Sequence, residues 1–166
     1  MPGRIHLWRV EKERFAGTAR AGEGARIAGG RWNSAGHPAI YCSQSLALAV
    51  LEIVVHAVTP AERADPRVWF ELTMPGTVVR TLPPKRLPAG WNDPMPHPAT
   101  AALGDAWLRG GQAVALRVPS SLVPGEWNYL LNPLHPRFRQ LVRWARPRPL
   151  TLDHRLVRAG VQPDQS

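Results

Sequence analysis

Two polar residues interrupt the most apolar stretch of the chain. Residues 45–58, SLALAVLEIVVHAV, form a nearly continuous apolar run that predicts a buried helix over 44–58. Glu52 lies in the middle of this run, and His56 follows one helical turn later. An unpaired carboxylate in apolar surroundings is costly, so a buried Glu52 needs a partner or a purpose. We therefore treat Glu52 as a candidate functional residue.

Shorter apolar segments predict strands elsewhere. They are rich in β-branched and aromatic residues and are bounded by Gly, Pro or polar turns, as strands commonly are. The segments are IHLWRV, PAIYCS, VWFELTM, VVRTL and AVALRVP. Together with the helix at 44–58 they predict an α+β fold in which strands dominate.

Two more helices and a long loop complete the expected organisation. TAALGDAWLRG predicts a helix that ends at the glycines 110–111, and HPRFRQLVRWA predicts another that ends before Pro147. Six prolines fall within 83–98, which excludes regular structure there and predicts a loop packed by Trp91. No linker divides the chain, so we expect one domain over 1–158 and a loose tail at 159–166.

Length and composition agree with a single globular domain. The chain has 166 residues, of which 44% are apolar and seven are tryptophan, which is enough for a packed core. Cys42 is the lone cysteine, which excludes an internal disulfide and suits a reducing compartment. The first residues lack the apolar core of a signal peptide, and the apolar run is too short to span a bilayer. We therefore expect a cytoplasmic protein without membrane contact.

The charge balance adds a possible anionic partner. The net charge is +9, and seven arginines gather late in the chain. This cluster fits either a solvated face or a surface for an anion or a partner protein. A basic nucleic-acid-binding module without catalysis is the alternative function, although no zinc-finger, RNA-recognition or basic-zipper spacing supports it. The clustered residues are Arg137, Arg139, Arg143, Arg146, Arg148, Arg155 and Arg158.

Other candidate residues lie on both sides of the apolar helix. Arg31 follows two glycines, which let backbone approach a ligand, and an arginine there can hold phosphate oxygens in a two-pronged contact. A surface arginine in a turn is the simpler interpretation. Polar residues also gather after the last predicted strand, where they either build a site or cap turns. They are Ser120, Ser121, Glu126, Asn128, Asn132 and His135.

Metal and nucleophile chemistry find little support in the sequence. Glu52 and His56 have a spacing compatible with shared metal coordination, but no HExxH or paired-cysteine motif accompanies them. Neither Cys42 nor Ser120 lies in a known nucleophile motif. No metal is therefore expected. The histidines that remain as further ligands are His6, His37, His97, His135 and His154.

Several motifs, in one order, resemble a known family. GGRWNSAGHPAIYCSQSLALAVLE, LGDAWL, VPSSLVPGEWNYLLNPLHP and LDHRL resemble the RES domain, named for an arginine, a glutamate and a serine. The resemblance runs from about Ile5 to Leu156. It implies a fold like that of ADP-ribosyltransferases and an enzyme that attacks NAD+ by hydrolysis, phosphorolysis or ADP-ribose transfer to a protein. It also implies a toxin of a bacterial toxin–antitoxin pair, inhibited by an Xre-type antitoxin.

The resemblance also assigns individual residues by motif. The chain departs from the family around GWNDP, because the family pattern has a tryptophan and an aspartate closer together. Asp93 is therefore left without a role. Ser121 adjoins the serine of the family motif and can take its place. The assigned residues are Arg31, Tyr41, Glu52, Ser120 and Asn128.

The chemistry of NAD+ suits these residue types. Nicotinamide leaves as a neutral molecule, so no general acid is required and the main task is to stabilise an oxocarbenium-like ribose. Glu52, ionised and bonded to a ribose hydroxyl, would place negative charge beside that cation. Arg31 would hold the phosphates, Tyr41 would border the nicotinamide, and Ser120 and Asn128 would orient the amide or ribose. NAD+ enters as substrate, and no further cofactor is expected.

Overall fold

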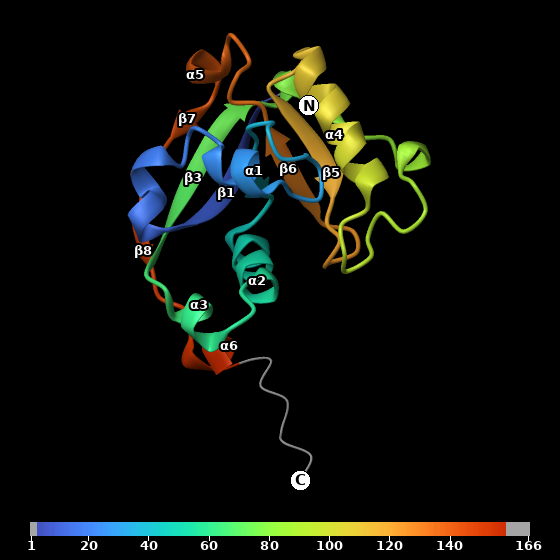
Figure 1. Ribbon diagram of the computed structural model, residues 1–166. Coiled ribbons are helices and arrows are strands. Elements are labelled where there is room, and N and C mark those ends of the chain that lie inside the picture. The colour runs from blue at the N-terminus through green and yellow to red at the C-terminus, as the bar shows by residue number, and fades with distance from the viewer. Residues whose placement is uncertain (1–2, 159–166) are drawn as a thin grey trace.

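The computed structural model describes residues 3–158, which form a mixed sheet with helices packed against it (Figure 1). Neighbouring strands follow the order β4, β5, β6, β2, β1, β3, β7, and β8 also pairs with β3. The pair β4–β5 is parallel and the other pairs are antiparallel. The strands are β1 (Arg4–Lys12), β2 (Ile40–Ser43), β3 (Arg67–Pro75), β4 (Val79–Thr81), β5 (Ala115–Pro119), β6 (Trp127–Leu131), β7 (Arg143–Trp144) and β8 (Arg148–Leu150).

The helices are short, and two of them shape the site. Among residues 3–158, none has both the length and the apolar character needed to cross a bilayer. The α-helices are α1 (Glu23–Ala28), α2 (Leu46–His56), α3 (Pro60–Ala64), α4 (Pro98–Gly110), α5 (Phe138–Leu141) and α6 (His154–Arg158). The 3-10 helices are η1 (Glu13–Thr18), η2 (Gly76–Val78) and η3 (Pro84–Arg86).

Strand alternation divides the core between the two faces of the sheet. Successive side chains of a strand point to opposite faces, and neighbours on β5 and β6 belong to different clusters accordingly. Leu131 packs in one cluster with residues of β1 and β3, whereas Leu130 packs in the other with Leu108 of α4. Figure 1 shows α4 lying beside β5. The fold is thus a single α+β domain, as predicted from the sequence.

Most predicted elements are confirmed. The five predicted strands correspond to β1 to β5, and the helices expected at 44–58 and 100–110 correspond to α2 and α4. Ser45 caps α2, its Oγ accepting a hydrogen bond from the Leu48 amide at 3.1 Å. Gly111 ends α4 with a left-handed backbone, at φ 58°. The tail predicted at 159–166 lies outside the described residues.

The secondary structure differs from the sequence-based expectations at three places. The helix expected at 135–145 is one turn, α5, followed by β7, because Trp144 pairs with Leu72 at the edge of β3. Strand β6 was not predicted; it falls in the stretch after β5 whose polar residues we expected either to build a site or to cap turns, and its last three residues are buried. The stretch 83–98 is irregular except for η3, where Pro84 takes the first position of a 3-10 turn, and for Pro98, which begins α4.

Candidate active site

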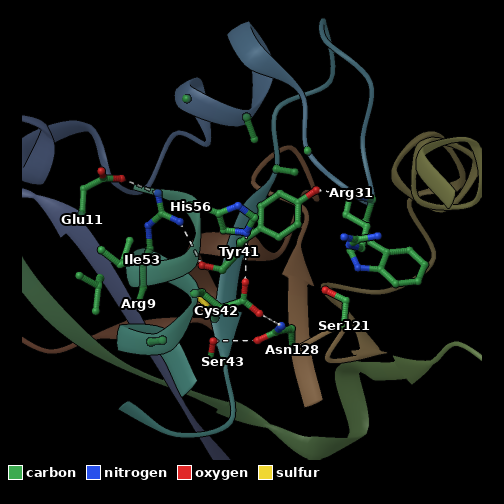
Figure 2. Close-up of a pocket in the computed structure, with 18 of the residues that line it drawn as sticks. Arg9, Glu11, Arg31, Tyr41, Cys42, Ser43, Ile53, His56, Ser121 and Asn128 are labelled. Carbon is green, nitrogen blue, oxygen red and sulfur yellow. Dashed lines mark hydrogen bonds and ion pairs between the residues drawn. The ribbon is translucent and has the colours of Figure 1, made fainter. Parts of the chain in front are cut away.

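A pocket opens where β1 and β2 separate. The two strands pair at Trp8 and Ser43, and the described pairing does not continue to Val10 and Tyr41. A cavity of about 610 Å³ lies there, lined by both strands, by α2 and by the segment around Arg31. This volume lies within the range of small-molecule sites, roughly 300–1,000 Å³. Figure 2 shows the labelled lining side chains, with Tyr41 between Arg9 and Arg31.

The structure gathers four of the residues predicted from the sequence around this cavity. Arg31 belongs to the loop after α1, Tyr41 to β2, Glu52 to α2 and Asn128 to β6, and all four line the pocket. They are separated by as many as 97 positions in the chain, counting from 31 to 128. Folding therefore assembles one site from motifs that are distant in sequence.

Glu52 presents its carboxylate at the edge of the cavity. Its Oε1 accepts a hydrogen bond of 2.7 Å from Asn128 Nδ2, and its Oε2 lies 3.2 Å from His56 Nε2. The Glu52 side chain is 22% exposed and that of His56 is 71% exposed, so the glutamate that we expected to be buried is only partly buried. The reason is that α2 leaves Val55 and Leu51 exposed instead of being buried on all sides.

Asn128 is itself held from β2. Ser43 Oγ donates a hydrogen bond of 2.8 Å to Asn128 Oδ1, and the two residues are register partners across β2 and β6 (Figure 2). Ser43 is buried and lines the pocket. Sequence reasoning missed it, although strand alternation in IYCS places Ser43 on the same face as Tyr41. That alternation is the signal that would have found it.

Tyr41 anchors the loop that carries Arg31. Its hydroxyl donates a hydrogen bond of 2.6 Å to Asn33 Oδ1 and accepts one of 3.0 Å from the Trp32 amide. Burial raises the pKa of the Tyr41 hydroxyl above its usual range, and the hydrogen bond from Trp32 opposes part of that shift. A Cβ on Gly30 would lie 2.6 Å from the Tyr41 hydroxyl, so glycine is needed for this close approach.

Asn33 holds the rest of that loop through hydrogen bonds to backbone carbonyls. Its Nδ2 donates to the carbonyls of Ala25 and His37, each at 2.9 Å. Because Asn33 is 1% exposed, these hydrogen bonds are shielded from water. The GGRWN motif is thus a loop whose shape is set by one buried asparagine and the hydroxyl of Tyr41.

Arg31 joins the pocket wall to the proline-rich loop. Its Nη1 donates to the carbonyl of Trp91 at 2.6 Å, and its Nη2 donates to the carbonyl of Asp93 at 2.8 Å. The rings of Trp32 and Trp91 lie 6.1 Å apart. Asp93, which had no assigned role, contributes through its backbone. A phosphate bound by Arg31 would share or replace these carbonyl acceptors, and the predicted phosphate contact stays a prediction.

The LGDAWL motif fixes the same loop from α4. Asp105 Oδ1 accepts a hydrogen bond of 2.9 Å from the Ser34 amide. A Cβ on Gly104 would lie 1.6 Å from the Trp32 carbonyl oxygen, so helix and loop backbones touch at this glycine. The motif acts on the site by holding the loop that carries Arg31.

The structure separates the two adjacent serines. Ser120 is buried, and its Oγ accepts hydrogen bonds of 3.1 Å from the amides of Leu122 and Val123, so it shapes the turn after β5. Ser121 lines the cavity, whereas Ser120 is absent from its lining. Ser121 is thus the serine placed to reach a ligand in the cavity, and a functional role for either serine stays a prediction.

A second arginine lies in the cavity wall. Arg9 Nη1 donates to the Tyr41 carbonyl at 3.0 Å, and its Nη2 donates to Glu11 Oε2 at 2.5 Å. The first contact joins β1 to β2 beyond the point where their pairing ends. Arg9 was not among the residues predicted from the sequence, because a single arginine in a strand carries no recognisable spacing.

Cysteine and metal chemistry gain no support from the geometry. Burial raises the pKa of the Cys42 thiol to about 12, so the thiolate is disfavoured although Cys42 lines the cavity. Within residues 3–158, no three His, Cys, Asp or Glu side chains are grouped as metal ligands. Within the described residues, Glu52 and His56 therefore have no third metal-ligating side chain grouped with them. The expectation that the site holds no metal stays a prediction.

The late arginine cluster is separate from this site. The seven arginines between 137 and 158 are exposed, and the cavity lining includes none of them. Arg148 lies over the Trp69 ring at 5.0 Å, and Arg155 Nε is paired with Asp153 Oδ1 at 2.9 Å. Both observations are compatible with a solvated face or with a partner surface.

Comparison with known proteins gives consistent matches over almost the whole chain. The family model described as RES domain matches residues 6–153. A protein of Photorhabdus laumondii named Toxin Res is 34% identical over 153 residues, covering 92% of this chain and 97% of that protein. A Toxin Res of Yersinia enterocolitica is 36% identical, covering 90% and 98%. A Prs ADP-ribosylating toxin of a Sphingobium species is 32% identical, covering 83% and 91%.

Proposed function

The chain belongs to the RES domain family, and on that premise we propose that it is a bacterial toxin that cleaves the nicotinamide–ribose bond of NAD+. The fold of this family is related to that of ADP-ribosyltransferases. The names of the similar proteins support a toxin function, and one of them supports an enzymatic toxin. Depletion of NAD+ would then arrest growth.

The observation that carries the proposal is the environment of Glu52. One carboxylate oxygen is held by Asn128 at 2.7 Å, while the other has the exposed His56 as its neighbour at 3.2 Å. A carboxylate so placed at a cavity can stabilise positive charge that develops on a ribose. The bond between ribose and nicotinamide breaks with its electron pair leaving on nicotinamide, and no proton donor is needed.

Other lining residues support a dinucleotide substrate. Arg31 brings positive charge to the cavity wall, as an anionic pyrophosphate requires, and Arg9 lies there in an ion pair with Glu11. The ring of Tyr41 offers an apolar surface for nicotinamide, and Ser121 offers a hydroxyl near β5. The pKa of Tyr41 is raised by burial, so its hydroxyl remains neutral and keeps the loop in place during turnover.

Three acceptors can receive the ADP-ribose. The Sphingobium relative is named an ADP-ribosylating toxin, which favours transfer to a protein. Water and inorganic phosphate are the other acceptors, and they give hydrolysis and phosphorolysis. Each acceptor leaves a different product, and nicotinamide is released in all three reactions.

An inhibitor protein follows from the same activity. An unrestrained NAD+ consumer would harm the cell that makes it, and we propose a cognate Xre-type antitoxin as the restraint. Expression of the protein alone is expected to arrest growth, and co-expression of the antitoxin is expected to relieve the arrest. Normal growth with active protein and unchanged NAD+ would contradict the toxin assignment.

Incubation of purified protein with NAD+, with and without phosphate, tests the reaction directly. Mass spectrometry is expected to find released nicotinamide together with ADP-ribose, phosphorylated ADP-ribose or a modified protein. Intact NAD+ after incubation with folded protein would contradict the proposal. Salt-dependent binding to nonspecific duplex DNA, without loss of NAD+, would instead support a nucleic-acid-binding module.

A further inference from the structure

Ser43 and Asn128 make a side-chain contact that the sheet does not require. Backbone pairing already joins β2 to β6 over four register pairs, and Ser43 with Asn128 is the last of them. The hydrogen bond of 2.8 Å between Ser43 Oγ and Asn128 Oδ1 is additional to this ladder. Ser43 is 4% exposed, so water does not compete for its hydroxyl. The contact therefore constrains the Asn128 side chain more than it constrains the strands.

The chemistry of the three groups gives the hydrogen bonds a single direction. An ionised carboxylate can only accept, so Asn128 must turn its NH2 group toward Glu52 Oε1, at 2.7 Å. Its carbonyl oxygen then faces Ser43, whose hydroxyl must donate. The chain of donors runs from Ser43 through Asn128 to Glu52. An amide turned the other way would place two acceptor oxygens against each other.

We propose that Ser43 is a positioning residue for the Glu52 carboxylate. The Ser43 hydroxyl fixes the plane of the Asn128 amide, and the amide fixes Oε1, which sets the orientation of the carboxylate while Oε2 lies beside the exposed His56. The proposal rests on the proposed function, since it assigns Ser43 a part in NAD+ cleavage. It predicts that Ser43 acts through Asn128 and has little effect of its own on substrate binding.

The location of Glu52 explains why such a chain is needed. Glu52 belongs to α2, whereas Asn128 belongs to β6, and their contact joins positions 76 residues apart. Rotation of a long glutamate side chain would move the carboxylate away from the reacting carbon. Small displacements of a reacting group reduce rates strongly, about a hundredfold for roughly 1 Å. Hydrogen bonds from neighbouring side chains that hold the carboxylate are a common way to prevent this.

A double-mutant cycle on the rate of NAD+ cleavage tests the proposal. Ser43→Ala, Asn128→Ala and the double variant are compared with wild type, with kcat and KM measured separately. We expect Ser43→Ala to lower kcat about tenfold or more, with KM changed by less than about threefold. We expect the double variant to match Asn128→Ala alone, because the two residues act in series. Ser43→Thr retains the hydroxyl and is expected to restore most of kcat.

Ser45→Ala is the matched control for the loss of a serine hydroxyl. Ser45 caps α2 and does not line the cavity, so its loss is expected to lower the melting temperature with kcat nearly unchanged. Additive losses in the double variant, or wild-type kcat in Ser43→Ala, would overturn the positioning role. Glu52→Gln distinguishes failure of the Ser43 role from failure of the proposed function. If wild type is active, Glu52→Gln is inactive and Ser43→Ala is unaffected, only the role of Ser43 is refuted. If folded wild type is inactive, both the proposed function and the role of Ser43 are refuted.

Discussion

Arg31 and Trp91 are joined by a hydrogen bond of 2.6 Å from the guanidinium Nη1 to the tryptophan carbonyl. The neighbouring Nη2 makes a similar contact with Asp93, so one arginine holds the loop 83–98 against the pocket wall. A planar guanidinium can serve two acceptors at once, which a single ammonium group cannot reproduce in the same geometry. The arginine of the GGRWN motif thus has a structural task in addition to its proposed contact with phosphate.

Arg31→Lys is therefore expected to impair the protein although it keeps the charge. We expect KM for NAD+ to rise about tenfold or more, since hydrogen bonds to charged groups contribute about 1.5–3 kcal/mol. Hydrogen exchange in 83–98 is expected to accelerate in the same variant. Arg109→Lys, at an exposed position of α4, is the control and should leave both unchanged. Wild-type KM and exchange in Arg31→Lys would refute this double role.

The contact between α4 and the loop predicts a severe effect of one methyl group. In Gly104→Ala the new Cβ would lie 1.6 Å from the Trp32 carbonyl oxygen, and backbone must move to accept it. We expect a loss of about 3 kcal/mol or more in the free energy of unfolding. Gly110→Ala, where nothing lies within 4 Å of the new Cβ, should be neutral or stabilising. Similar urea midpoints for the two variants would contradict this packing.

The raised pKa of the Tyr41 hydroxyl predicts a loss of stability at alkaline pH. Burial raises the pKa of its hydroxyl in the folded protein, so the stability that it contributes is complete below the ordinary tyrosine pKa of about 10. That contribution is lost as the pH rises above this value. Tyr41→Phe removes this part of the pH dependence, and it costs about 1–3 kcal/mol at neutral pH because buried partners lose their hydrogen bonds.

Urea unfolding of wild type and Tyr41→Phe between pH 7 and 11 measures this difference. Cys42 is present in both proteins, so the alkaline effect of its raised thiol pKa cancels in the comparison. We expect the two unfolding free energies to converge as the pH rises beyond about 10. A constant difference across the range would show that Tyr41 does not titrate differently in the folded and unfolded states.

The local pattern of apolar and polar residues predicted several of the strands and helices. The apolar run at 45–58 and the alternating segments of β1, β3 and β5 match the structure within a few residues. The segment 135–145 does not, because Phe138 and Val142 fit a helix face as well as they fit a buried turn. Pairing of Trp144 with β3 decides the outcome, and that contact is tertiary.

The sequence predicted residues that lie around one cavity, but it did not predict the contacts between them. Arg31, Tyr41, Glu52 and Asn128 were assigned by motif, and all of them line one cavity. The acceptors of Arg31 are backbone carbonyls, which carry no signature in a side-chain sequence. The choice between two adjacent serines likewise depended on which hydroxyl the following turn uses. Such contacts are decided by the path of the backbone.

The most direct test of the account is NAD+ consumption by Glu52→Gln. The substitution keeps the size and the hydrogen-bonding oxygen of the side chain but removes its charge, so the fold and binding of NAD+ should persist. Turnover is expected to fall on the order of a hundredfold to a thousandfold, because a neutral amide cannot stabilise a cationic ribose. Glu13→Gln, at an exposed position outside the site, is the control and should consume NAD+ as wild type does. Wild-type consumption of NAD+ by folded Glu52→Gln would contradict the central role of this carboxylate.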